Sequence, residues 1–335
     1  MTRKLGSSEI VVSALGLGCW AAGGSLWYLQ DGQRYPLSYG TIRDDEIIRA
    51  IHRALDLGVN FYDTADAYGC GHSERILGRA IEDYRDQVIL ATKFGNVFDE
   101  KSRTWLGHPD PPLTREYIHQ CCEASLKRLS TDYIDLYQFH WKEYDVKLVS
   151  ELIPLLDELV EEGMIRYYGW STPYLEQARE FVKGTRCIAI QYNYNIFERN
   201  PEMLAFCSEF NQASIIRGPY AMGLLTGKYT DGSKLPENDM RHAWWNFKDG
   251  RQAEQLKLLA SIQEILTRDN RTLVQGALGW LWSIDPQTIP IPGFKSVEQV
   301  EETIGALEFG PLPNEQMEEI EQILEPFLSD MIVID

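Results

Sequence analysis

The chain alternates short apolar runs with longer stretches in which apolar residues recur at helical spacing. After Asp44 and Asp45, for example, Ile51, Ala54 and Leu55 fall on one face of a helix, and the two aspartates suit its first turn. Further helices are predicted at about residues 73–82, from residue 113 onward, and at 148–162. Eight runs have the length and composition of buried strands: residues 15–17, 59–63, 88–93, 133–140, 165–171, 187–192, 213–217 and 289–292.

This alternation predicts one α/β domain over residues 1–335. Parallel strands need crossover connections, so the pattern fits either a closed barrel or a doubly wound sheet. No linker, fixed-period repeat or low-complexity segment divides the chain. Residues 24–42 and 225–251 are predicted as long loops, and loops of that length within a compact domain are usually functional.

The acidic composition of the chain narrows the choice of partners. It has 32 Lys and Arg against 50 Asp and Glu, a net charge of −18. This balance argues against nucleic acid and anionic membranes as partners, and a phosphate site would have to be a local cluster of cations. No apolar run approaches the roughly 18 residues needed to span a bilayer. The first residues do not resemble a secretory signal, and the six cysteines show no disulfide-framework spacing, so we expect a cytoplasmic protein.

Four polar residues stand at or just after the carboxyl ends of predicted strands: Asp63, Tyr68, Lys93 and His140. In a parallel barrel these strand ends face one mouth, where active sites form. Reduction of a carbonyl needs a proton for the oxygen, and a tyrosine is better suited to supply it when an adjacent ammonium lowers its pKa from about 10. A carboxylate would hold that ammonium in place, and a histidine could orient the carbonyl or donate to it.

Four segments that contain or adjoin these residues resemble the aldo-keto reductase family. Residues 61–69 read Phe-Tyr-Asp-Thr-Ala-Asp-Ala-Tyr-Gly, residues 71–78, 91–95 and 132–141 continue the likeness, and it extends over nearly the whole chain. The resemblance implies a single (β/α)8 TIM barrel with an N-terminal β-hairpin and long loops at the C-terminal mouth. It also implies an enzyme that moves a hydride between NADP(H) and the carbonyl or alcohol of a small aldehyde, ketone or sugar. Its catalytic tetrad would be Asp63, Tyr68, Lys93 and His140, with Tyr68 as general acid and base and with no metal.

The same resemblance assigns cofactor contacts. The nicotinamide amide would be held by Ser171, Thr172 and Gln191, although Thr172 stands where relatives have Asn. Residues 223–228 resemble the loop over the pyrophosphate, where Lys228 would neutralise phosphate charge. Lys295 and Ser296 would hold a 2′-phosphate on the adenosine ribose. The other positions expected to contact the cofactor are Gly18, Trp20, Arg217, Pro219, Gly223, Leu224, Gln299 and Glu302.

Two of these positions carry further expectations. Trp20, in the loop after the first strand, would face the mouth and line the substrate pocket. Arg217 aligns with an aromatic residue that stacks on the nicotinamide in many relatives. Its planar guanidinium could cover the same ring, and its charge would disfavour the positively charged oxidised form.

Two other functions stay open. Many relatives have Arg where this chain has Gln299 and Asn where it has Thr303, so NADP is expected but NAD is possible. An NAD-linked sugar or polyol dehydrogenase is therefore the first alternative, and a nucleotide-sensing regulatory subunit, as the channel-associated members of the family are, is the second. The substrate depends on the loops at residues 24–42, 95–112 and 225–251, and fold class does not choose it. Oligomeric state and reaction direction do not follow from the sequence.

Overall fold

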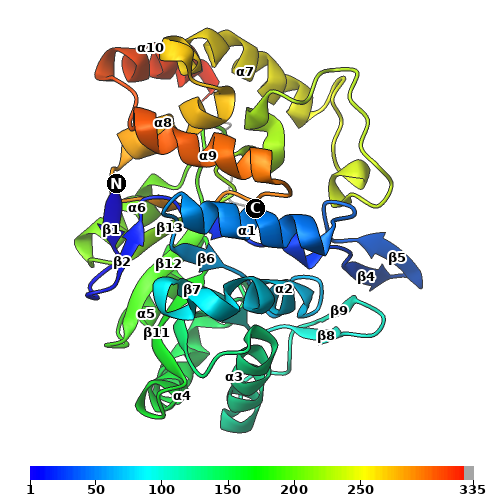
Figure 1. Cartoon of the computed structure of the whole chain (residues 1–335), viewed down its shortest axis with the longest axis vertical. Helices are drawn as coiled ribbons and strands as arrows, with labels where there is room; N and C mark the ends of the chain where they lie inside the picture. Colours follow the sequence, from blue (N-terminus) through cyan, green and yellow to red (C-terminus); the bar gives the residue numbers. More distant parts are fainter. Residues whose placement is uncertain (328–335) are drawn as a thin grey trace.

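The computed structural model describes residues 1–327 as eight parallel strands surrounded by helices (Figure 1). Neighbouring strands pair in the order β14-β13-β12-β11-β10-β7-β6-β3. Backbone hydrogen bonds from Gly16 N to Pro290 O and from Gly18 N to Pro292 O, both 2.9 Å, join the first strand to the last. The predicted barrel is confirmed. Its strands are β3 (Leu17–Gly18), β6 (Phe61–Asp63), β7 (Ile89–Phe94), β10 (Ile134–Phe139), β11 (Ile165–Ser171), β12 (Cys187–Asn193), β13 (Ala213–Arg217) and β14 (Ile289–Pro290).

One helix follows each of the first six barrel strands, and two helices follow each of β13 and β14. The first helix buries Ile51 and Ala54, as the apolar spacing predicts, together with Ile47 and Ala50, while Leu55 is only partly buried. No helix within residues 1–327 is both long and apolar enough to cross a membrane. The helices are α1 (Asp44–Asp56), α2 (His72–Ile81), α3 (Arg115–Leu129), α4 (Val149–Glu161), α5 (Leu175–Phe181), α6 (Pro201–Glu209), α7 (Arg251–Leu266), α8 (Leu273–Ile284), α9 (Val297–Phe309) and α10 (Asn314–Leu324).

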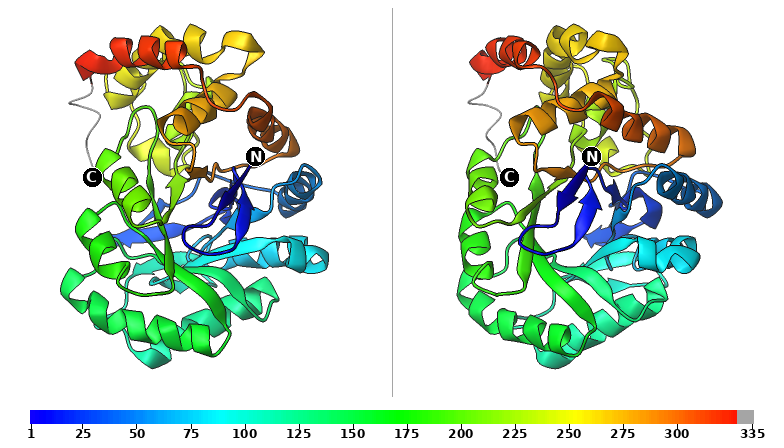
Figure 2. Two further views of the ribbon diagram at one scale, coloured as in Figure 1. Left: turned by 90° about the vertical axis from the view of Figure 1, so that its left-hand side faces the viewer. Right: turned by 60° about the vertical axis from the view of Figure 1, so that its left-hand side comes forward.

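An N-terminal hairpin packs on the interior of the barrel, as predicted. Strands β1 (Thr2–Lys4) and β2 (Val11–Ser13) pair antiparallel. Leu5 and Val12 belong to one buried cluster with strand residues such as Phe61. Figure 2 shows this hairpin lying across one end of the barrel. Because the hairpin takes that end, the opposite end, where the strands finish, is left for a site.

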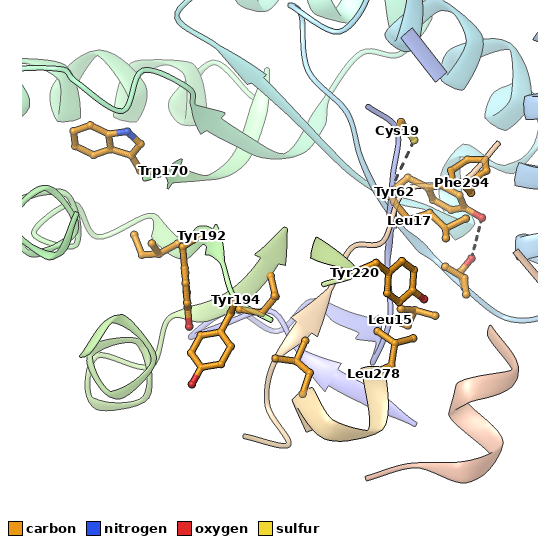
Figure 3. Packing of buried hydrophobic residues seen from close by; sticks show 14 of the residues in the cluster. Leu15, Leu17, Cys19, Tyr62, Trp170, Tyr192, Tyr194, Tyr220, Leu278 and Phe294 are labelled. Carbon is orange, nitrogen blue, oxygen red and sulfur yellow. Dashed lines mark hydrogen bonds between the residues drawn. The ribbon is translucent and has the colours of Figure 1, made fainter. Parts of the chain in front are cut away.

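A larger apolar cluster lies between the strands and the helices. Figure 3 shows part of it, including Tyr62, Tyr192 and Phe294. Trp170 and Trp280 in the same cluster are fully buried. Burying one large apolar side chain stabilises a fold by roughly 1.5–3 kcal/mol, so this layer holds the helices firmly against the strands.

The segment at residues 24–42, predicted as a loop, contains a β-hairpin. Strands β4 (Trp27–Gln30) and β5 (Gln33–Pro36) pair antiparallel across Asp31 and Gly32, which have φ of 51° and 76°. An Asp-Gly pair between two strand-like runs is a strong signal for a two-residue hairpin turn. The prediction of an irregular loop is wrong here because it overlooks that pair.

A second hairpin joins the first to form a four-stranded sheet, which we name the mouth sheet. Strands β8 (Val97–Asp99) and β9 (Thr104–Gly107) follow β7 and pair antiparallel. Strand β4 pairs parallel with β9, which gives the order β5-β4-β9-β8. The mouth sheet thus unites two connections that leave the carboxyl ends of different barrel strands.

The long segment at residues 225–251 reaches across to the first hairpin region. Tyr39 and Asp239 form an isolated β-bridge, and Met240 N donates to Ser38 O at 2.8 Å. Next to this bridge, Asp239 and Arg241 form a buried ion pair at 2.5 Å. The segment is ordered by these contacts rather than by long regular elements.

Candidate active site

The four predicted catalytic residues meet at the carboxyl ends of β6, β7 and β10. Asp63 ends β6, Lys93 lies near the end of β7, Tyr68 precedes α2, and His140 follows β10. Lys93 is completely buried, and its ammonium lies 2.5 Å from Asp63 Oδ1 and 2.9 Å from the Tyr68 hydroxyl oxygen. A third hydrogen bond runs to the Thr64 carbonyl at 2.8 Å. All three protons of the ammonium therefore have partners.

Two glutamines complete the environment of Asp63. Gln138 Nε2 donates to Asp63 Oδ2 at 2.7 Å, and Gln191 Nε2 donates to the same oxygen at 2.9 Å. A buried ion pair is tolerated only when the remaining lone pairs are satisfied, and these amides satisfy them. The sequence analysis misses Gln138. The available signal is its place on the inward face of β10, two positions before His140.

The pKa of Tyr68 differs from expectation. Burial raises the pKa of the Tyr68 hydroxyl above its usual value, and the Lys93 ammonium lowers it in part. The expectation of a net lowering is wrong for this chain, because desolvation outweighs the neighbouring charge. Tyr68 therefore carries its proton at neutral pH, which is the form that can donate to a carbonyl oxygen.

His140 lies beside Tyr68, with ring centroids 6.0 Å apart and planes at 82°. Burial and the neighbouring cations hold the pKa of His140 well below its usual range, so the ring is neutral. Asn96 Nδ2 lies 3.3 Å from His140 Nδ1, and Trp105 Nε1 donates to Asn96 Oδ1 at 3.0 Å. The sequence analysis assigns no role to Asn96, because its contacts depend on the mouth sheet.

Aromatic rings line the mouth around these groups. Trp20 packs edge-on against Tyr68, with ring centroids 4.7 Å apart. His108 stacks on Trp141 at 4.6 Å with nearly parallel planes, and Trp105 lies edge-on to His108 at 5.6 Å. Trp20 therefore packs directly on the Tyr68 ring, while Trp105, His108 and Trp141 form a second aromatic group.

Arg217 ends β13 and approaches the same mouth. Its nearest hydrogen-bond partner is Asn193 Oδ1 at 3.5 Å. Within residues 1–327 no carboxylate lies close enough to form an ion pair with it. The guanidinium influences the pKa of Tyr68 and His140, so its charge acts on the tetrad.

Three cationic side chains lie close together at the loop of residues 223–228: Lys228 in the loop itself, Arg241 and Lys295. Partial desolvation and the neighbouring Arg241 and Lys295 lower the pKa of Lys228 to about 8. Gly223 has φ 101°, and a Cβ there would lie 3.3 Å from Lys228 Nζ and 3.5 Å from a terminal nitrogen of Arg241. Asp239 already pairs with Arg241, whereas no carboxylate within residues 1–327 forms an ion pair with Lys228 or Lys295, so these two lysines are the cations left for the phosphates expected from the sequence. Arg241 belongs to no motif, and the sequence analysis misses it.

The start of α9 carries Lys295, Ser296 and Gln299, three of the predicted cofactor positions. The Ser296 hydroxyl caps α9 by accepting from Gln299 N, and Gln299 Oε1 accepts from Lys295 N at 2.8 Å. The Lys295 ammonium donates to the Tyr39 carbonyl. Gln299 therefore shapes the turn that carries Lys295. At the helix start, Val297 N donates to Glu46 Oε1 at 3.2 Å, so a carboxylate of the chain already lies there.

Thr303 and Thr172, which replace asparagines of many relatives, both have partners within the chain. Thr303 Oγ1 lies 3.1 Å from the Tyr220 hydroxyl. The Thr172 hydroxyl donates to Gln177 and accepts from Tyr174 N at 3.1 Å. Ser171 is less engaged, since its hydroxyl has a single 3.5 Å contact to Gln191 Oε1.

The remaining predicted cofactor positions have clear structural surroundings. A Cβ at Gly18 would lie 2.6 Å from the Ile291 carbonyl, so the glycine permits the closure of the barrel. Leu224 is buried in the larger apolar cluster. Pro219 is buried beside Tyr220, and the Glu302 carbonyl accepts from Gln275 Nε2 at 3.1 Å. The structure thus gives Gly18 and Leu224 packing roles.

A cluster of His119, Glu158 and Glu162 lies on α3 and α4, away from the tetrad. Their possible ligand atoms lie within 4.8 Å of one another. Arg115 binds Glu158 at 2.5 Å and Glu162 at 3.0 Å. The guanidinium already supplies the positive charge that these carboxylates need.

A closed (β/α)8 barrel with an Asp, a Lys, a Tyr and a His at its carboxyl-end mouth defines the class of the aldo-keto reductases. The model of the Aldo/keto reductase family matches residues 14–325, and the chain belongs to this family of oxidoreductases.

Individual relatives agree with this assignment. The aldo-keto reductase YhdN of Bacillus subtilis is 34% identical over 334 residues, covering 98% of this chain and 95% of its own. An aldo-keto reductase of Schizosaccharomyces pombe, yakc, whose name specifies NADP(+), is 31% identical over 313 residues, covering 91% of this chain and 86% of its own. The solved glycerol dehydrogenase of Gluconobacter oxydans is 28% identical with a TM-score of 0.80, covering 100% of this chain and 97% of that chain.

Proposed function

We propose that the chain catalyses the NADP(H)-dependent reduction of a small aldehyde, ketone or sugar, with Tyr68 as general acid and, in the reverse direction, general base. The observation that carries the proposal is the buried Lys93 ammonium between Asp63 and the Tyr68 hydroxyl, at 2.5 Å and 2.9 Å. A fixed ammonium beside a phenol stabilises the phenolate that forms as the proton leaves.

The cation cluster and the start of α9 are suited to hold the cofactor. Lys228 lies near Gly223 and would neutralise the charge of the pyrophosphate, while Arg241, paired with Asp239, lies near the same glycine. Lys295 and Ser296 would receive a 2′-phosphate, which the name of the yakc relative supports. The bound nicotinamide supplies the hydride to the carbonyl carbon or accepts it from an alcohol.

The residues of the tetrad have distinct tasks. Tyr68 donates its proton to the carbonyl oxygen, and Lys93 stabilises the phenolate left behind. Asp63 keeps Lys93 charged and in position, since both the ion pair and the phenol oppose the effect of burial on the pKa of Lys93. The neutral His140 orients the carbonyl oxygen beside Tyr68.

Replacing Tyr68 by Phe tests this proposal. The ring and its packing against Trp20 are retained, so the variant should fold and bind cofactor as the wild type does. Loss of the general acid should lower the rate of carbonyl reduction by about 10²- to 10⁴-fold. The assay uses both cofactors with a panel of aldehydes, ketones and sugars. A variant that kept half the wild-type rate, with chemistry rate-limiting, would remove Tyr68 from this role.

A second candidate is oxidation of a polyol with NAD. Two observations favour it: the likeness to a glycerol dehydrogenase, and the engagement of the Lys295 ammonium by the Tyr39 carbonyl. Dissociation constants for NADPH and NADH, measured with rates on glycerol and other polyols, separate the two. A clear preference for NAD and polyols would support this second candidate.

A further inference from the structure

The Asn96 side chain lies between two groups that fix which way its amide points. Asn96 directly precedes β8 and is 8% exposed, and its backbone carbonyl accepts from the Tyr117 hydroxyl at 3.3 Å. The indole N–H of Trp105 can only donate, so the atom 3.0 Å from it must be the amide oxygen. The amide nitrogen is then the atom that lies 3.3 Å from His140 Nδ1.

This orientation determines where the proton of His140 sits. An amide NH2 can only donate, so Nδ1 must offer its lone pair. Burial and the positive charges of Lys93 and Arg217, with a smaller effect of His108, keep the pKa of His140 well below its usual range. The ring therefore holds a single proton, and it must be on Nε2.

We propose that Asn96, oriented by Trp105, is a positioning residue that holds His140 in the Nε2–H tautomer, so that Nε2 donates to the substrate carbonyl oxygen. The proposal rests on carbonyl reduction as the function. A carbonyl oxygen can only accept hydrogen bonds. The other tautomer would turn the lone pair of Nε2 toward that oxygen and repel it.

The tautomer matters because the tetrad then presents two donors to one oxygen. The Tyr68 oxygen already accepts from Lys93, which leaves the hydroxyl proton for the substrate. His140 Nε2–H is the second donor. One donor aimed at a developing oxyanion is typically worth about 10²- to 10³-fold in rate. Asn96 and Trp105 thus link the mouth sheet to the chemical step without touching the substrate.

Replacing Asn96 by Asp tests the assignment, because it keeps the shape and exchanges the donor for an acceptor. The carboxylate should draw the proton of His140 to Nδ1, which the ¹⁵N chemical shifts of the ring nitrogens report directly. The turnover number should fall by about 10²- to 10³-fold, while the Kd for NADPH stays unchanged. At acid pH the ring gains its second proton and Nε2–H returns, so the loss should shrink there. A packing defect would show no such recovery.

A matched control makes the same change of charge away from the mouth. Asn211 lies in an exposed turn with φ 51°, a conformation that Asp also accepts. Asn211→Asp should leave both the His140 shifts and the turnover number unchanged. A loss in Asn211→Asp equal to that in Asn96→Asp would overturn the proposal.

A second variant acts from the other end of the chain of hydrogen bonds. Trp105→Phe keeps a ring but removes the N–H, so the amide of Asn96 can turn over and both tautomers should appear. The turnover number should fall by about 2- to 10-fold, the worth of one ordinary hydrogen bond. If Asn96→Asp does not fold, unchanged His140 shifts in Trp105→Phe would overturn the proposal.

The ring shifts need no turnover, which separates this proposal from the proposed function. A wild-type His140 protonated on Nδ1 would overturn the role of Asn96 even in an active reductase. Conversely, a tautomer that switches in Asn96→Asp supports that role even if no carbonyl tested is reduced, and the proposed function alone then fails.

Discussion

Lys93→Met removes the charge nearest to the Tyr68 hydroxyl. At an effective dielectric constant of about 20, a unit charge 2.9 Å from a phenolate oxygen contributes about 6 kcal/mol. Asp63 stays in the variant and disfavours the phenolate with or without Lys93, so the stabilisation that is lost is that of the ammonium alone. The variant should therefore raise the pKa of Tyr68 further above its usual value.

The pH profile of alcohol oxidation measures this change. Oxidation needs the phenolate as proton acceptor, so the midpoint of its basic limb should move to higher pH. Carbonyl reduction at neutral pH should slow by about 10²- to 10⁴-fold, the usual worth of general acid catalysis, because the phenolate formed in the step loses the stabilisation by Lys93. Circular dichroism and the Kd for NADPH report whether the variant still folds and binds cofactor.

Lys93→Met leaves the buried Asp63 carboxylate without its partner, which should also lower the stability of the variant. Leaving one charge of a buried pair without its partner typically costs about 3–5 kcal/mol of stability. Lys93→Met combined with Asp63→Asn removes both charges and should recover much of that stability but not the activity. A folded Lys93→Met protein whose oxidation profile keeps its midpoint would refute the tuning of Tyr68 by Lys93. If the double variant regained activity, the lower activity of Lys93→Met would result from its lower stability and not from the missing charge.

Three further changes test other parts of the site and fold. Lys295→Ala should weaken NADPH binding by about 1–3 kcal/mol, the range of a charge-assisted contact, and leave NADH nearly unchanged in fluorescence titrations. Arg217→Tyr should tighten oxidised cofactor more than reduced, because a fixed positive charge disfavours the cationic ring; dissociation constants for both forms check this. Burial raises the pKa of Asp66 to about 8, so the folded chain keeps a proton that the unfolded chain loses above about pH 4. Stability should therefore fall as pH rises from about 4 to 8, and Asp66→Asn should flatten that part of the Tm profile.

Each of these has an outcome that contradicts it. Equal weakening of NADPH and NADH would show that Lys295 does not bind a 2′-phosphate. An unchanged ratio of the two dissociation constants would rule out electrostatic discrimination by Arg217. A Tm profile of Asp66→Asn that keeps the wild-type slope would assign the pH dependence to other groups.

Local apolar patterns in the sequence are sufficient to predict where the barrel strands lie. Residues 165–171 and 213–217 were predicted as strands and form β11 and β13 with the same bounds. Strands buried on both faces appear as continuous apolar runs, and their order along the chain sets the parallel topology. The position of polar residues after those runs also predicts that Asp63, Tyr68, Lys93 and His140 lie at one mouth of the barrel.

Relations across the chain could not be predicted in this way. Gln138 matters because it reaches Asp63, 75 positions away, and Arg241 because it approaches Gly223 and Lys228. Alternation along β10 places Gln138 on the same face as His140, but no local pattern indicates that Gln138 reaches Asp63 or that Arg241 reaches the loop at residues 223–228. The net direction of the pKa of Tyr68 also needed the structure, because desolvation depends on burial, and residue spacing does not report how deep a hydroxyl lies.

The mouth sheet has a consequence for exchanging substrate loops among barrels. Modular loop transplantation assumes that each connection folds independently on the barrel. Here β4 pairs with β9, with Trp27 opposite Thr104 and Tyr28 opposite Trp105. A donor segment grafted over residues 24–42 alone would remove β4, so β9 would pair only with β8 and Trp105 could shift. Exchanging both connections together should therefore change substrate preference more readily than exchanging either alone.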